Sequence, residues 1–106
     1  MRFKSGVKIN GLKTETLAAM IVADKIVWEE TGTDLVITSV CDGKHSPASL
    51  HYVGYGFDFR TRYTIKKLFT PLQKRNIKKK LQERLTREFD VVLEKDHFHI
   101  EFQPKR

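Results

Sequence analysis

The chain has 106 residues, of which 40% are hydrophobic and 31% are charged, so composition favours one small folded domain and excludes disorder. The formal net charge of +7 favours anionic partners, such as nucleic acid, anionic lipid surfaces or acidic wall polymers. A single cysteine, Cys41, excludes an internal disulfide. No signal-peptide core and no run of ~20 apolar residues is visible, so we expect synthesis in the cytoplasm and no membrane segment.

The first part of the chain predicts an extended segment, a helix and a strand. Residues 1–13 alternate weakly between apolar and polar types. Thr14 is a suitable N-cap for the helix, and Gly32 suits its C-terminal end. The β-rich run from Asp34 to Val40 predicts a central strand. The apolar face of the helix, with Trp28 as core anchor, is expected to comprise Leu17, Met20, Ile21, Val27 and Trp28.

The middle of the chain predicts a polar loop followed by a strand with one polar face. The loop runs from Cys41 to Ser49 and contains glycine and proline. From Tyr55 to Arg62, aromatic residues alternate with glycine and charged residues, which is typical of a strand with one face in the core. Asp58 and Arg60 are therefore expected together on the other face.

A second helix is predicted to begin at Thr70-Pro71, where a capping hydroxyl precedes a proline at the first helical position. Its buried stripe is expected to comprise Leu72, Ile77, Leu81 and Leu85. The rest of its surface is crowded by basic residues, namely Lys74, Arg75, Lys78, Lys79, Lys80, Arg84 and Arg87. Such a run most often marks a solvated helix face, and the alternative is a docking surface for a polyanion.

Two β runs near the C-terminus are separated only by Lys95-Asp96, which predicts a two-residue hairpin. The runs extend from Phe89 to Glu94 and from His97 to Phe102. In such a hairpin Glu94 and His97 face each other, and the period of two puts His99 and Glu101 on the same side. The side chains expected to enter the core are Leu93, Phe98, Ile100 and Phe102.

Two segments contain the side chains that zinc uses as ligands. His51 and Asp58 lie seven positions apart across two glycines, and the hairpin offers a third ligand from His97 or His99. Glu94 is placed to deprotonate a zinc-bound water and to protonate a leaving amine. Each residue alone also has a structural explanation, such as capping a loop or pairing with an arginine. The coincidence of two polar segments, each with histidine and carboxylate, favours the metal interpretation.

The first segment reads Ser49-x-His51-x-x-Gly54-x-Gly56-x-Asp58, and the second reads Glu94-x-Asp96-His97-x-His99. Together they resemble the zinc D-Ala-D-Ala carboxypeptidase and L-Ala-D-Glu endopeptidase family, which shares the Hedgehog signalling-domain fold. The resemblance covers roughly residues 34–103, and the chain looks like the short single-domain members encoded by phages and prophages. It implies a single α+β domain over residues 1–106, with a small antiparallel sheet and two main helices on one side.

The resemblance also implies one zinc ion, with His51, Asp58 and His99 as its ligands. Ser49 matches the family serine that holds substrate near the metal. His99 is preferred as the third ligand because family members with His-x-His use the second histidine and often continue with an acidic residue. His97 is the alternative, because it matches the members that have Glu-x-x-His.

The remaining roles follow from the same resemblance. Glu94 is the favoured catalytic base and His97 orients the water, whereas Asp96 is a weaker alternative because the turn is expected to point it away. Many relatives carry an arginine in the loop before the first motif, where it binds the substrate carboxylate, and this loop has none. Lys44 would substitute as a point charge, and Arg60 is a second candidate. Carboxypeptidase and endopeptidase action therefore stay open as alternatives.

The leading interpretation is a zinc peptidase that cleaves peptidoglycan stem peptides, acting at the cell wall after release or as part of a phage particle. The alternative is a non-catalytic zinc-binding module with a structural or recognition role. A nucleic-acid binder accounts for the net charge but not for the histidines, so no nucleic-acid partner is expected. We expect the protein to act as a monomer.

Overall fold

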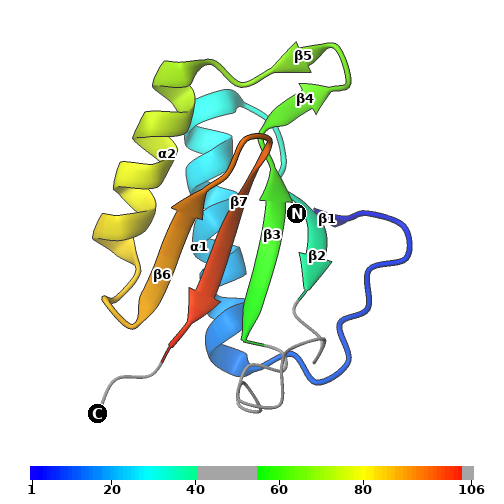
Figure 1. The fold of residues 1–106 in the computed structure, drawn as a ribbon, viewed down its shortest axis with the longest axis vertical. Coiled ribbons are helices and arrows are strands. Elements are labelled where there is room, and N and C mark those ends of the chain that lie inside the picture. Colours follow the sequence, from blue (N-terminus) through cyan, green and yellow to red (C-terminus); the bar gives the residue numbers. More distant parts are fainter. Residues whose placement is uncertain (41–54, 104–106) are drawn as a thin grey trace.

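The computed structural model describes residues 1–40 and 55–103, and these form a two-layer α+β domain (Figure 1). The helices are α1 (Thr14–Thr31) and α2 (Pro71–Arg84), and the strands are β1 (Arg2–Phe3), β2 (Val36–Val40), β3 (Gly56–Arg60), β4 (Arg62–Thr64), β5 (Lys67–Leu68), β6 (Phe89–Leu93) and β7 (His97–Phe102). Five strands form a sheet in the order β1-β2-β3-β7-β6, and β4 pairs with β5.

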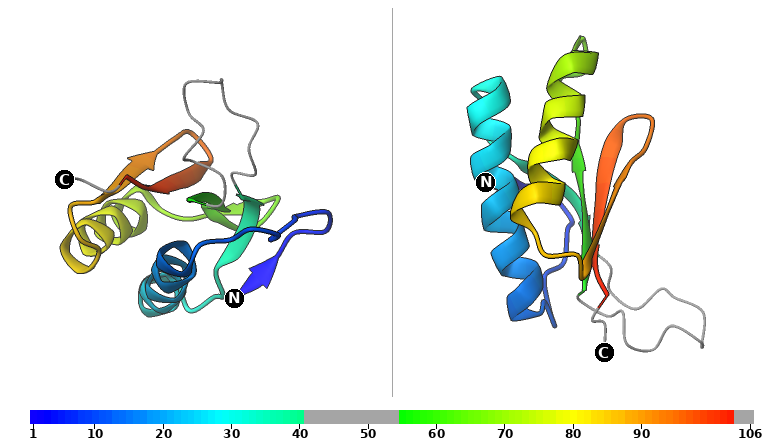
Figure 2. Two further views of the ribbon diagram at one scale, coloured as in Figure 1. Left: turned by 90° about the horizontal axis from the view of Figure 1, so that it is seen from below. Right: turned by 90° about the vertical axis from the view of Figure 1, so that its left-hand side faces the viewer.

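The large sheet is antiparallel except at one edge, where β1 runs parallel to β2. Both helices lie against the same face of this sheet (Figure 2). The predicted α+β class, with a mostly antiparallel sheet and two main helices in the described part of the chain, is therefore confirmed. The parallel β1 and the small β4–β5 hairpin were not predicted.

The core lies between this face of the sheet and the helices. Phe57 and Phe59 of β3 are fully buried, and the ring of Phe59 stacks on that of Phe98 in β7 with centroids 5.0 Å apart. The alternation predicted for residues 55–62 is thus confirmed. The β6–β7 hairpin is also confirmed, because the Glu94 amide donates a hydrogen bond to the His97 carbonyl, 2.8 Å away, across the Lys95-Asp96 turn.

Helix α1 ends as predicted but buries a different face. Gly32 adopts the left-handed conformation, with φ of 72°, and caps the helix. Lys13, rather than Thr14, is the N-cap, and no side chain caps that end. Trp28 is 58% exposed, so its predicted role as core anchor is wrong. The residues that α1 buries are Thr16, Ala19, Met20, Ala23, Ile26 and Val27.

Two alanines explain the change of face on α1. Ala19 and Ala23 are buried and small, so the helix backbone lies close to its neighbours there. Leu17 and Ile21 project from a different side and are 43% and 57% exposed, against the prediction. Met20 and Val27 are buried as predicted. A count of large apolar residues wrongly added Leu17, Ile21 and Trp28, because small residues carry the close packing.

Helix α2 begins with a complete capping box, as its sequence predicts. The Thr70 hydroxyl accepts from the Gln73 amide, and the Gln73 side chain accepts from the Thr70 amide. Three members of the predicted stripe are buried, namely Ile77, Leu81 and Leu85. Leu72 is 56% exposed, against the prediction, because five residues turn an α-helix by about 140° and carry it away from Ile77.

Part of the basic surface of α2 lies against α1, although the side chains of Lys80 and Arg84 are still 30% and 38% exposed. Lys80 Nζ lies 2.7 Å from a carboxylate oxygen of Glu30, and Arg84 Nη1 lies 3.0 Å from one of Glu29. These contacts lower the pKa of Glu30 and raise that of Lys80, because each charge stabilises the other. This pair of contacts joins the two helices.

Candidate metal centre

The strand register brings the expected ligands of two distant segments together. Asp58 at the middle of β3 lies directly opposite His99 of β7, and the neighbouring pair is Arg60 with His97. Because side chains alternate along a strand, all four project from the face opposite the aromatic core. Neither helix covers that outer face (Figure 2).

His99 lies between two carboxylates. Its Nδ1 is 2.6 Å from Asp58 Oδ1, and its Nε2 is 3.1 Å from Glu101 Oε1. Gln103 donates from Nε2 to the other oxygen of Glu101 over 2.6 Å. The hydrogen bond to Asp58 is the main cause that raises the pKa of His99 to about 9, although partial burial opposes it, and Glu101 adds to the rise. At neutral pH this imidazole is therefore protonated on both nitrogens.

His97 lies at the margin of the same cluster. Its Nε2 is 3.9 Å from Asp58 Oδ2, and its Nδ1 is 2.8 Å from Asp96 Oδ1. The hydrogen bond with His97 lowers the pKa of Asp96. Asp96 is 80% exposed, so the turn does direct it toward solvent as expected, yet it still contacts His97. Glu94 is exposed and continues the hairpin register opposite His97.

The described residues include two of the three expected zinc ligands. Asp58 and His99 offer a carboxylate oxygen and an imidazole nitrogen in direct contact, which is a donor pair that suits zinc. Glu101 occupies the second nitrogen of His99, as carboxylates commonly do for metal-binding histidines. In residue type these two ligands fit the ion, but a bound ion would have to replace the proton that joins His99 to Asp58. His97, the alternative ligand, lies farther from Asp58, because its Nε2 is 3.9 Å from Asp58 Oδ2.

Three predicted site residues lie outside the described part of the chain. They are Lys44, Ser49 and His51. Within the described residues, no set of three His, Cys, Asp or Glu side chains is arranged to hold a metal ion. The remaining expected ligand, His51, lies in the sequence between β2 and β3, and Asp58 lies in β3 itself.

Arg60 is close to the cluster, as the sequence suggested, but its guanidinium has a backbone partner. Its Nη2 donates to the carbonyl of Tyr63 over 3.1 Å. Burial, followed by repulsion from Arg62 and Arg2, lowers the pKa of Arg60. Arg60 therefore sits beside His97 in a cationic neighbourhood and not in an ion pair.

A pocket of about 220 Å³ opens beside the cluster. It is lined by Lys4, Thr38, Asp58, Arg60, Arg62, Asp96 and His97. Sequence reasoning missed Lys4 and Arg62 in this pocket. No local sequence pattern predicts Lys4 in this pocket, because only the parallel pairing of β1 with β2 brings it there. The alternation along β7 predicted that Glu101 and His99 share this face, and the structure adds their hydrogen bond.

Comparison of the chain with protein-family models, with curated proteins and with solved structures found no match. Among residues 1–40 and 55–103, neither helix has the length and apolarity needed to cross a membrane.

Proposed function

We propose that the protein is a zinc-dependent peptidase that hydrolyses peptide bonds in peptidoglycan stem peptides, like the phage-encoded enzymes that its motifs resemble. The observation that supports this most is the contact of Asp58 with His99 on the outer face of the sheet. Three further polar side chains on or beside this face have the types that such a site requires, namely Glu94, His97 and Glu101.

In this proposal Asp58, His99 and His51 hold the ion. When bound, zinc supplies a Lewis acid that polarises the scissile carbonyl and lowers the pKa of a water molecule toward ~7. Glu101 fixes the orientation of the His99 ring through Nε2. These contacts are preorganised by the pairing of two strands, which keeps the ligands on a rigid element.

The proton transfers in this proposal involve the hairpin. Glu94 accepts the proton of the attacking water and passes it to the leaving amine. His97 orients the water, and Asp96 holds the His97 ring through Nδ1. Peptide cleavage at the cell wall would follow release of the protein from the cell in which it is made.

The test combines metal analysis with digestion of purified muropeptides, followed by mass spectrometry, with and without a chelator. We expect about one zinc per chain and loss of cleavage when the metal is removed. Glu94→Gln should retain zinc and lose cleavage by about 100-fold or more, because general acid–base catalysis contributes about 10²–10⁴-fold. Glu83→Gln, which changes an exposed glutamate of α2 in the same way, is the matched control.

The outcomes separate the two candidate functions. If Glu94→Gln leaves cleavage unchanged, Glu94 is not the base. If zinc binds and no muropeptide is cleaved by the unmodified protein, the catalytic proposal is wrong and the non-catalytic zinc-binding module takes its place. If no zinc binds at all, both are wrong.

A further inference from the structure

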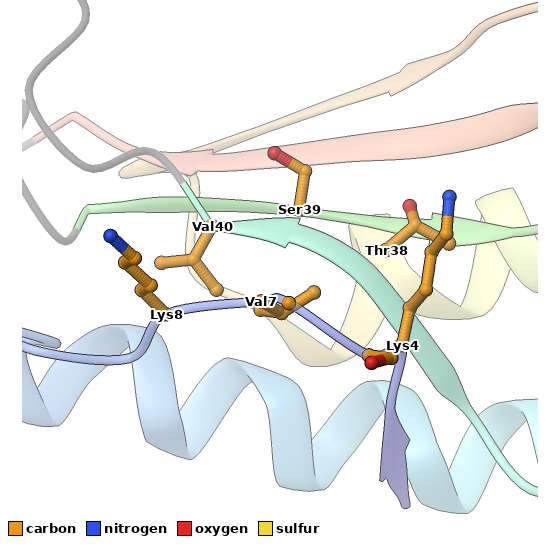
Figure 3. Close-up of a pocket in the computed structure, with 8 residues that line it drawn as sticks. Lys4, Val7, Lys8, Thr38, Ser39 and Val40 are labelled. Carbon is orange, nitrogen blue, oxygen red and sulfur yellow. The ribbon is translucent and has the colours of Figure 1, made fainter.

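Two adjoining pockets lie along the N-terminal segment and the edge of the outer face. The larger has a volume of about 330 Å³ and lies between the segment after β1 and strand β2 (Figure 3). The smaller is the pocket of about 220 Å³ beside Asp58. Lys4 and Thr38 line both pockets, so the two meet at these residues. We name the combined feature the Lys4 groove.

The larger pocket is cationic and carries hydrogen-bond donors. Among the described residues its lining includes Lys4 and Lys8 with the hydroxyls of Thr38 and Ser39, and no carboxylate, and the Thr38 hydroxyl also donates to the Asp58 carbonyl over 3.4 Å. Figure 3 shows the amines of Lys4 and Lys8 and the hydroxyl of Ser39 pointing to the same side of β2. Two positive charges and neutral donors without a negative charge favour an oxyanion as the ligand.

The backbone explains how both lysines reach this pocket. The Lys4 amide donates to the Ile37 carbonyl over 2.8 Å, which continues the β1–β2 pairing. A turn then follows, in which the Val7 amide donates to the Lys4 carbonyl over 3.1 Å and Gly6 has φ of 90°. The turn reverses the chain and returns Lys8 alongside the end of β2.

In the smaller pocket the carboxylates contact histidines, whereas the hydrogen bond of Arg60 goes to the Tyr63 carbonyl and not to a carboxylate. Asp58 and Asp96 are hydrogen-bonded to His99 and His97. By contrast, no ion pair within the described ranges involves any of the four cations of the groove, which are Lys4, Lys8, Arg60 and Arg62.

The two arginines of the smaller pocket also have unused donors. The Nε atoms of Arg60 and Arg62 are buried without a hydrogen-bond partner among the described residues. A buried N–H without an acceptor is costly, because its hydration is lost and not replaced. An oxyanion in this pocket would offer an acceptor and would add negative charge where Lys4, Arg60 and Arg62 face only Asp58 and Asp96 in the described lining.

We propose that the Lys4 groove binds a ligand that carries at least two oxyanion groups, carboxylate or phosphate. One group would lie in the larger pocket between Lys4 and Lys8, and the other beside Arg62 in the smaller pocket. The site adjoins the Asp58–His99 pair, because Asp58 lines the smaller pocket, but the proposed anion contacts are made by the cations and require neither zinc nor hydrolysis.

The test is a titration of the ¹⁵N-labelled full chain, freed of metal with a chelator and then dialysed, and followed by amide chemical shifts. Pyrophosphate and succinate are the two probes, so the phosphate and carboxylate arms are compared directly. Saturable shifts are expected at Lys4, Lys8, Thr38, Ser39 and Arg62. The probe that binds more tightly identifies the chemistry of the ligand.

Two double variants with equal charge decide whether the groove itself is responsible. Lys4→Gln with Lys8→Gln should weaken binding of the better probe by about tenfold or more, because it removes both cations of the larger pocket. Lys78→Gln with Lys79→Gln removes the same charge from α2 and should change binding less than about twofold. An unchanged amide spectrum outside the groove verifies that both variants fold.

Equal weakening by the two double variants would show that net charge alone attracts the probe, and would overturn the proposal. Shifts spread over α2 and the groove alike would do the same, as would no saturable binding of either probe. Arg62→Gln gives an independent check on the smaller pocket, because it leaves the N-terminal segment unchanged.

Discussion

The two faces of the β3–β7 strand pair consist of alternate residues of the same strands and behave differently. On the inner face Phe57, Phe59 and Phe98 are fully buried and make apolar contacts. On the outer face Asp58 and His99 are partly exposed and make short, directional hydrogen bonds. The inner contacts tolerate little change of volume, whereas the outer contacts depend on charge and proton position. Stability and candidate chemistry are therefore carried by different sides of one sheet.

The largest effect is expected on the inner face. Phe98→Ala should lower the free energy of unfolding by about 3–5 kcal/mol, because it removes a fully buried ring that stacks on Phe59. Urea denaturation of the variant beside the unmodified chain measures the loss. A loss below about 1 kcal/mol would contradict the division between the faces, since the ring would then contribute little to the core.

The next largest effect is expected on the outer face, at the proposed zinc site. His99→Ala should weaken zinc binding by more than about 100-fold, and Glu101→Gln by about 10–100-fold, because a ligand matters more than the group that orients it. Competition with a fluorescent chelator measures both affinities. Equal losses, or a larger loss for Glu101→Gln, would contradict the assignment of His99 as a ligand.

The charge state of His99 provides a third test of the difference between the two faces. In the metal-free protein its pKa is raised from 6.5 to about 9, so its contribution to stability is complete below about pH 6.5 and is lost as pH rises through 9. Imidazole NMR signals followed against pH measure this value directly. In Asp58→Asn the pKa should fall toward its ordinary value, since the main cause of the rise is removed. An unchanged titration would refute that cause.

The smallest effect is expected from a matched pair on β6 and β7. Val92 lies opposite His99 on the outer face and is 42% exposed, so Val92→Thr should change the free energy of unfolding by less than about 0.5 kcal/mol. Ile100→Thr places the same hydroxyl on the inner face, where the side chain is fully buried, and should cost at least about 1–3 kcal/mol. Thermal unfolding of both variants makes the comparison, and similar losses would contradict it.

Much of the fold was predictable because its signals are local. A period of two places Asp58 and His99 on polar faces of their strands, and the core aromatic residues fix which face is which. Gly32 and Thr70-Pro71 mark helix boundaries through conformations that few other residues favour. The contact of Asp58 with His99 needed only the additional fact that β3 and β7 are neighbours.

Leu72 was misplaced by local helix geometry, whereas Trp28 and Lys4 depend on packing between distant elements. Trp28 has the size of a core residue, but Ala19 and Ala23 determine which side of α1 approaches its neighbours. Lys4 reaches the outer face through parallel pairing across more than thirty residues of chain, for which no turn or period gives a signal. Three expected site residues, Lys44, Ser49 and His51, lie outside the described residues, and their roles stay predictions.

The two-residue turn between β6 and β7 determines what kinds of sequence change the protein tolerates. If one residue inserted beside Lys95 slipped the register by one, the two sides of β7 would be exchanged. His97, His99 and the rest of the polar set would then face the core, and Phe98 would face solvent. Because burial of Phe98 and Ile100 opposes such a slip, the inserted residue would instead be taken up in a longer turn. The turn should therefore tolerate insertions that the interiors of β6 and β7 do not.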